Sequence, residues 1–314
     1  MYDKVSLWLN SVMGNERQEA VARHLNDAVT QIDNQTGEVR TFGGLGGLKV
    51  SLFGGGLSIV GSLPKYLYGG GNVYPLDRHT TADVVTKISD ALHLDIGDAD
   101  VRSIEFGTIF MMMHKVSDYL DRLGDMPRMN RCRATDTSLY YTGNGRRQLK
   151  TFNIYDKTAE AKAKGMPIPS MLEGANLLRY EMRLNGCLGQ QLKEPPVKAS
   201  TLYQLPFYSK VMGLYQKSYY SIQKFNQVKT NVMSDIETVG DAFNVFVARL
   251  MSKNPEEAAD FMSELKRADV FSDRKCYTRL KNKMKEVAAK ADISNVDELV
   301  RELDNDMLNC GAYV

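Results

Sequence analysis

The chain has 314 residues, enough to bury a substantial core in one large domain or two modest ones. Its formal net charge of +2 is too small to indicate nucleic-acid binding by itself. No apolar stretch approaches the roughly 20 residues that span a bilayer, so we expect a cytoplasmic protein without membrane contact. The four cysteines lack metal-like spacing, which argues against a zinc signature and a disulfide framework.

The first third of the chain predicts strands with one early helix. Residues 3–9 alternate polar and apolar side chains, residues 16–28 have helical spacing, and residues 48–53 and 57–63 predict antiparallel strands joined by glycines. The glycine-rich stretch lacks the Gly-Lys-Ser/Thr ending of a phosphate-binding loop. Lys65 and Asn72 follow it and could hold a DNA phosphate or base, although an ordinary loop explains them equally well on residue type.

Two later strands each carry a glutamate among apolar residues. In residues 101–110, Glu105 lies on the face opposite Ile104 and Phe106, and in residues 176–184, Glu181 lies opposite Tyr180 and Met182. A carboxylate in such a strand is costly unless it is exposed, paired or bound to a metal. Either a salt bridge or a metal site would explain each glutamate.

Residues 139–160 predict a β-hairpin that ends at Tyr155. The Gly143-Asn144-Gly145 turn tolerates positive φ angles, and alternation places Tyr155 at the end of the second strand. A tyrosine there can be a packed core residue. Charged residues follow it at once, however, and a phenol in such a place can attack phosphorus if a cation or metal stabilises the negative charge.

The run SLYYTGNGRRQLKTFNIYDKTAE resembles the catalytic-tyrosine hairpin of rolling-circle replication initiators, specifically phage and plasmid replication proteins of the gene II/X type. The stretches GSLPKYLYGGGNVY, VRSIEFGTIF and NLLRYEMRL match in the same order, at residues 61–74, 101–110 and 176–184. The resemblance covers roughly residues 45 to 205. Tyr140 and Tyr141 are rival nucleophiles by chemistry alone, and the match at IYDK favours Tyr155.

The resemblance implies a tyrosine endonuclease related to the HUH class. Tyr155 would be the nucleophile, Lys157 would assist it, and Glu105 and Glu181 would hold Mg²⁺ or Mn²⁺, which prefer oxygen ligands. A third metal ligand is left open between His79 and His114. The residues expected to contact DNA are Lys65, Asn72, Arg146, Arg147, Arg179 and Arg183.

The expected fold is α+β. We predict an antiparallel-sheet nuclease domain at residues 1–205, with helices on one face and the site on the other. Beyond residue 203 the pattern is helical almost throughout, and residues 206–314 are assigned to a smaller helical domain. Residues 272–290 form a basic amphipathic segment that fits either origin DNA or a solvated surface.

The expected activity is metal-dependent nicking of one DNA strand at an origin through a 5′-phosphotyrosyl intermediate, followed by strand rejoining. The expected partners are single-stranded and origin DNA, a host helicase and a host polymerase, and a homodimer is left open. Two alternatives remain: a mobilisation relaxase with the same chemistry, and a DNA-binding regulator that keeps the fold without catalysis. Metal binding separates the regulator from both nucleases.

Overall fold

The structure, a computed structural model, describes residues 1–11, 14–143, 145, 148–225, 238–253, 255–290 and 298–310. Ten described strands form one sheet in the order β2-β3-β4-β5-β1-β6-β10-β9-β8-β7, and every neighbouring pair is antiparallel. The strands are β1 (Tyr2–Asn10), β2 (Asn26–Ile32), β3 (Val39–Leu45), β4 (Leu48–Phe53), β5 (Gly56–Ser62), β6 (Asp100–Met112), β7 (Met129–Thr135), β8 (Ser138–Gly143), β9 (Lys150–Asp156) and β10 (Asn176–Asn185).

Helices follow and interrupt these strands. The α-helices are α1 (Asn15–Ala22), α2 (Leu63–Tyr68), α3 (Arg78–Leu92), α4 (Val116–Leu120), α5 (Lys157–Ala163), α6 (Leu188–Leu192), α7 (Leu205–Tyr220), α8 (Val239–Lys253), α9 (Pro255–Arg267), α10 (Arg274–Lys290) and α11 (Glu298–Asn309). Short 3₁₀ turns are η1 (Ile96–Asp98), η2 (Ser170–Leu172) and η3 (Ala199–Thr201). In the described part of the chain, no helix combines the length and apolar character needed to cross a membrane.

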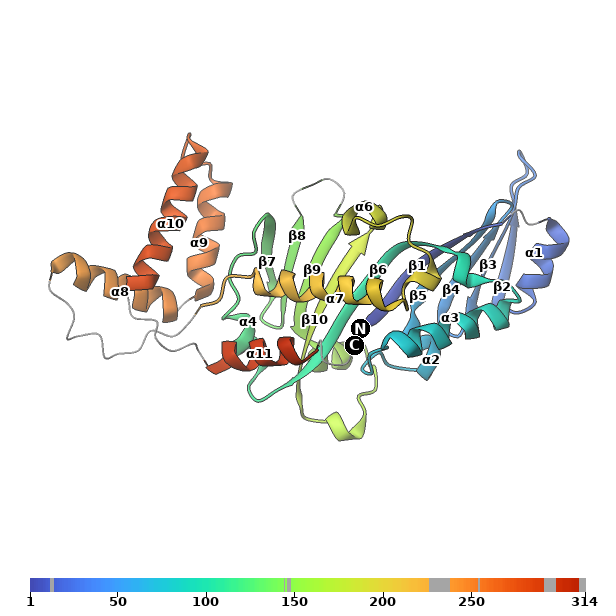
Figure 1. The fold of residues 1–314 in the computed structure, drawn as a ribbon, viewed down its shortest axis with the longest axis horizontal. Helices are drawn as coiled ribbons and strands as arrows, with labels where there is room; N and C mark the ends of the chain where they lie inside the picture. Colours follow the sequence, from blue (N-terminus) through green and yellow to red (C-terminus); the bar gives the residue numbers. More distant parts are fainter. Residues whose placement is uncertain are drawn as a thin grey trace.

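One face of the sheet carries the main hydrophobic core. Figure 1 shows α7 and α11 crossing in front of the central strands, with α3 in front of the other half of the sheet. Alternation along β6 and β10 points Phe106 and Tyr180 into this layer, where their ring centroids lie 5.4 and 4.6 Å from that of Tyr215 on α7. The predicted α+β fold, an antiparallel sheet with covering helices followed by further helices, is confirmed.

Two predicted elements differ in extent. α1 ends at Ala22, earlier than expected, because Leu25 reaches the core from a turn and the chain then extends into β2. In the hairpin, β8 and β9 pair as predicted, but β9 begins only at Lys150. The connection is therefore longer than a two-residue turn, and Asn144 lies outside the described residues.

The helices beyond residue 205 pack in two places. α7 and α11 contribute buried residues to the main core, including Tyr215 and Met307. α8, α9 and α10 contact one another, with Ala248 and Val287 buried in a small core of their own. The division of the chain at residue 205 stays a prediction, and the packing singles out α8 to α10 as the helices with a separate core.

Candidate metal and catalytic site

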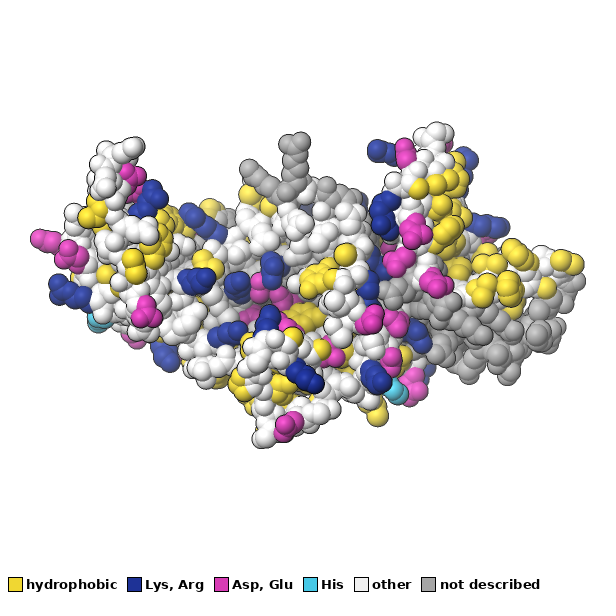
Figure 2. All heavy atoms as spheres, turned by 180° about the vertical axis from the view of Figure 1, so that it is seen from behind, with side chains coloured by type: hydrophobic (Ala, Val, Ile, Leu, Met, Phe, Trp, Pro, Cys, Tyr) yellow, Lys and Arg dark blue, Asp and Glu magenta, His cyan; other side chains and the backbone are white. Residues whose placement is uncertain are grey.

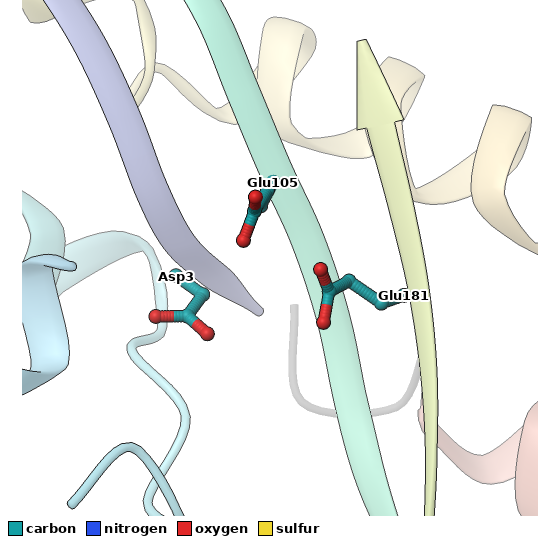
Figure 3. A group of neighbouring side chains, drawn as sticks. All are labelled: Asp3, Glu105 and Glu181. Carbon is teal, nitrogen blue, oxygen red and sulfur yellow. The ribbon is translucent and has the colours of Figure 1, made fainter. Parts of the chain in front are cut away.

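Three carboxylates meet on the face of the sheet opposite the main core. Asp3, Glu105 and Glu181 come from β1, β6 and β10, which are neighbours in the sheet. Figure 3 shows the three side chains reaching toward a common point, and one oxygen from each lies within 4.8 Å of the others. All three residues are buried. Three hard oxygen donors at this spacing fit Mg²⁺ or Mn²⁺.

Asp3 is the member of this group that sequence reasoning missed. Plain alternation would place it beside Val5 and Leu7 on the core face. The pairing of β1 with β6 shifts between Tyr2 and Val5, so one extra residue of β1 lies opposite β6. Such a β-bulge redirects side chains. Tyr2 therefore enters the core, while Asp3 joins the carboxylates. A carboxylate at the start of an otherwise apolar strand was the only signal.

Two arginines hold the carboxylates together. Arg179 on β10 is buried, and its guanidinium pairs with Asp3 and, through Nε at 3.1 Å, with Glu181. Arg183, two residues along the same face, pairs with Glu105 at 2.5 Å and Glu181 at 3.4 Å. These cations offset the repulsion among three buried negative charges. The Arg183 side chain is the more exposed of the two, at 39% against 4%.

The neighbouring charges shift the two outer carboxyl groups in opposite directions. Burial raises the pKa of Asp3, but Arg179 and hydrogen bonds from Ser62 and Asn72 outweigh burial and leave this pKa below its ordinary value. Burial, and next the Glu181 charge, raise the pKa of Glu105 to about 7. Glu105 is therefore the carboxyl whose charge changes near neutral pH.

Tyr155 lies at the edge of the carboxylate group. It ends β9 directly opposite Arg179 in the register of β9 and β10, and its hydroxyl donates a hydrogen bond to Glu181 Oε2 at 3.2 Å. Burial raises the pKa of the Tyr155 phenol, so the hydroxyl stays protonated at neutral pH. Asp156 then starts α5, because its carboxylate accepts a hydrogen bond from the backbone N–H of Ala159.

The rival tyrosines have different surroundings. Tyr141 is fully buried, and its hydroxyl donates to the carbonyl of Gly124 at 2.7 Å. It is a core residue. Tyr140 lies opposite Asn153 in the pairing of β8 with β9, and it lines the same cavity as Tyr155. Tyr140 is thus the matched comparison for Tyr155.

A hydrogen-bonded chain links Lys157 to the carboxylates. The Lys157 side chain is almost fully buried, and its Nζ donates to Asn72 Oδ1 at 2.8 Å and to Glu160 Oε2 at 2.6 Å. Asn72 Nδ2 in turn donates to Asp3 Oδ2 at 2.6 Å. Burial lowers the pKa of Lys157, although its pairing with Glu160 opposes the shift. Asn72 and Lys157 therefore fix the position of Asp3 from outside the group.

These residues line an open cavity of about 810 Å³. Its walls include the three carboxylates, Tyr155, Lys157 and Asn72, and Lys65 and Arg183 lie at its border. Figure 2 shows this face of the molecule, with acidic side chains near its centre and Lys or Arg side chains around them. A cavity with an acidic floor and a basic border suits a phosphodiester that approaches a bound cation.

The two histidines considered as a third metal ligand lie elsewhere. His79 lies at the start of α3 with its Nε2 2.7 Å from Arg78, and His114 lies beside the ring of Tyr119. Within the described residues, neither histidine lines the cavity or joins the carboxylates. Asp3 takes the third position instead. The expected DNA contacts Arg146 and Arg147 lie outside the described residues.

The fold and site define an α+β protein with an acidic site on the open face of one antiparallel sheet. Residues 1–203 match the family model that describes the N-terminal part of the phage replication-associated protein of gene II. The chain belongs to this family, which confirms its resemblance to the rolling-circle replication initiators of phages and plasmids. No match was found among curated proteins.

A solved structure, the rolling-circle replication initiator protein from Geobacillus stearothermophilus, is similar to this chain. The two are 13% identical, and the similarity covers 74% of this chain and 88% of that one with a TM-score of 0.39.

Proposed function

We propose that this initiator nicks one DNA strand at a replication origin, with Tyr155 as the nucleophile and a divalent cation held by Asp3, Glu105 and Glu181. The observation that carries the proposal is the hydrogen bond from the Tyr155 hydroxyl to Glu181 at 3.2 Å. It ties a cavity-lining phenol to a group of carboxylates suited to Mg²⁺ or Mn²⁺.

Tyr155 Oη attacks the scissile phosphorus, and its proton passes to Glu181 Oε2, which already accepts the hydrogen bond. An acceptor is needed because burial raises the pKa of the phenol. The new Oη–P bond replaces the P–O3′ bond, and the departing O3′ takes a proton from water. The products are a 5′-phosphotyrosyl link and a free 3′-hydroxyl for a polymerase. Because the link conserves the phosphodiester's energy, the reverse attack rejoins the strand without ATP.

The remaining site residues position the DNA. Arg183 and Lys65 border the cavity and offer positive charge to phosphate oxygens. Lys157 and Asn72 hold Asp3 in place through their hydrogen bonds. Arg179, buried between Asp3 and Glu181, acts from within the protein. A bound divalent cation supplies Lewis acidity to the scissile phosphate.

The test compares Tyr155→Phe with Tyr140→Phe, because both tyrosines line one cavity. Each protein is incubated with labelled single-stranded origin DNA and Mn²⁺, and the products are analysed by denaturing gel and mass spectrometry. Wild type and Tyr140→Phe should give a DNA-linked peptide that contains residue 155, whereas Tyr155→Phe should give none. An adduct of Tyr155→Phe at residue 140 would contradict the assignment of the nucleophile.

Nicking at an origin also sets the expected setting of the protein. The proposed partners are single-stranded and origin DNA, a host polymerase that extends the 3′-hydroxyl, and a host helicase that opens the duplex. The proposed location is the cytoplasm. A single nucleophile cuts once, so termination calls for a second tyrosine or for a second protomer in a homodimer.

One observation favours a non-catalytic DNA-binding regulator instead. Arg179 and Arg183 already pair with all three carboxylates, so the group can be stable without a cation. Isothermal titration with Mn²⁺ separates the two functions. A regulator should bind no Mn²⁺, whereas a nuclease or a mobilisation relaxase should bind one ion that Asp3→Asn removes.

A further inference from the structure

Aromatic side chains gather on the same open face as the carboxylates, on the part of the sheet formed by β3, β4, β5 and β1. The ring centroids of Trp8 and Phe53 are 5.9 Å apart, and those of Phe42 and Phe53 are 6.3 Å apart. The guanidinium of Arg102 lies 4.5 Å from the centroid of the Trp8 ring. These four residues are called the aromatic patch below.

The strand registers place the patch on the face away from the main core. Trp8 is opposite Ser58, Ser51 is opposite both Ser58 and Phe42, and all of these alternate with core residues such as Ile59 and Val50. The three rings of the patch are half-buried, and Arg102 is exposed. The patch therefore presents ring edges and faces to solvent in a shallow surface.

Two lysines connect the patch to the carboxylate site. Lys4 on β1 and Lys49 on β4 are exposed, and both line the cavity that contains Tyr155. Along β1, Trp8 follows Asp3 by five residues, which is roughly 17 Å of extended chain. Among the described residues, neither Lys49 nor Arg102 has an acidic ion-pair partner. Their positive charge is thus open to a ligand.

We propose that the aromatic patch binds the bases of single-stranded DNA next to the cleavage site, while Lys4 and Lys49 contact the intervening phosphates. The proposal rests on the function proposed above, because that function brings a DNA strand to Tyr155. Aromatic rings and guanidinium planes stack on any base, and a basic groove follows the backbone without reading sequence. A strand lying from the carboxylates to Trp8 would meet these two features in that order.

Trp8 is the sole tryptophan of the chain, so its fluorescence reports directly on the patch. The full-length protein in EDTA is titrated with a mixed-sequence single-stranded oligonucleotide, and binding is followed in parallel by anisotropy of a label on the DNA. We expect the tryptophan emission to be quenched in step with the anisotropy change. Unchanged emission from fully DNA-bound protein would overturn the proposal, as would equal quenching by duplex DNA.

Variants identify the residues that stack. Phe53→Ala and Arg102→Ala should each weaken single-strand binding by about 10-fold, within the usual range for one stacked base. Phe261→Ala, on an exposed position of α9, is the matched control and should bind as wild type. Arg102 is exposed, so its variant tests the patch without a change in packing. Wild-type affinity of both patch variants would refute the proposal.

Failure of the inference and failure of the proposed function give different results. Quenching together with weakened binding of Phe53→Ala, but no covalent adduct, would leave the patch as a single-strand site on a protein that does not nick. An adduct at Tyr155 with no quenching would retain the nicking function and reject the patch as its strand-binding surface.

Discussion

At the scale of single residues, the site is a balance between three carboxylates and two arginines. Arg179 is buried and joins Asp3 to Glu181, so its removal would leave two buried charges without compensation. Arg183 is partly exposed and also pairs with Glu105. A cation that enters the group therefore competes mainly with Arg183, which can swing toward solvent or toward a DNA phosphate.

Metal binding should depend on pH through Glu105. The pKa of this carboxyl is raised to about 7, and a cation binds only its ionised form. Mn²⁺ affinity should therefore rise by up to about 10-fold per pH unit below pH 7 and level off above it. Titration calorimetry at several pH values measures this. Glu105→Gln should flatten the profile, while Glu173→Gln, at an exposed position, should not change it.

The free protein should show the opposite trend in stability. Because the folded pKa of Glu105 lies above its ordinary value, the folded state holds this proton more tightly than the unfolded chain. The contribution of Glu105 to the free energy of unfolding is thus present at low pH and declines as pH rises toward about 7. A Mn²⁺ affinity that is constant from pH 5 to 8 would contradict the role of Glu105 as a ligand.

At the scale of elements, regular strands made part of the site predictable and a bulge hid the rest. β6, β9 and β10 pair without register shifts, so alternation alone placed Glu105, Tyr155 and Glu181 on one face. β1 contains the bulge, which moves Asp3 to the opposite face from the one that alternation gives. Bulges depend on the pairing of distant strands, and a single sequence does not reveal that pairing.

The close approach of β6 and β10 also depends on one glycine. Gly107 lies directly opposite Glu181, and a Cβ at this position would lie 2.6 Å from the backbone oxygen of Tyr180 and 3.0 Å from Glu181 Cα. Backbone atoms of a central strand cannot move away alone. Any side chain here would push β10, and with it Glu181, away from β6.

Gly107→Ala should therefore lower the free energy of unfolding by about 1–3 kcal/mol, the usual cost of overpacking. It should also weaken Mn²⁺ binding, because Glu181 moves away from Asp3 and Glu105. Gly213→Ala is the control, since the added Cβ meets nothing within 4 Å on α7 and a helical glycine costs about 0.5–1 kcal/mol relative to alanine. Urea unfolding and Mn²⁺ calorimetry measure both effects. Equal stability of the two variants would rule out this account of the contact.

At the scale of the whole molecule, the sequence predicted the layers better than the association of the last helices. The amphipathic stripes after residue 205 predict helices, but a stripe does not identify the surface that it packs against. α11 follows α10 in the chain yet contacts α4, α7 and β6. Its Glu302 accepts a hydrogen bond from the backbone N–H of Met113 at 2.8 Å, and Asp304 accepts one from the hydroxyl of Tyr219 at 2.6 Å.

This packing makes α11 part of the folding unit that carries the site. Leu303 is 2% exposed and belongs to the main core, whereas Leu308 on the same helix is 64% exposed. Leu303→Ala should lower the free energy of unfolding of the sheet by about 2–5 kcal/mol, and Leu308→Ala should change it by less than about 0.5 kcal/mol. Urea unfolding followed by Trp8 fluorescence measures the sheet itself, because Trp8 lies on β1. If Leu303→Ala left this transition unchanged, the sheet and α11 would be separate folding units, as a domain boundary at residue 205 requires.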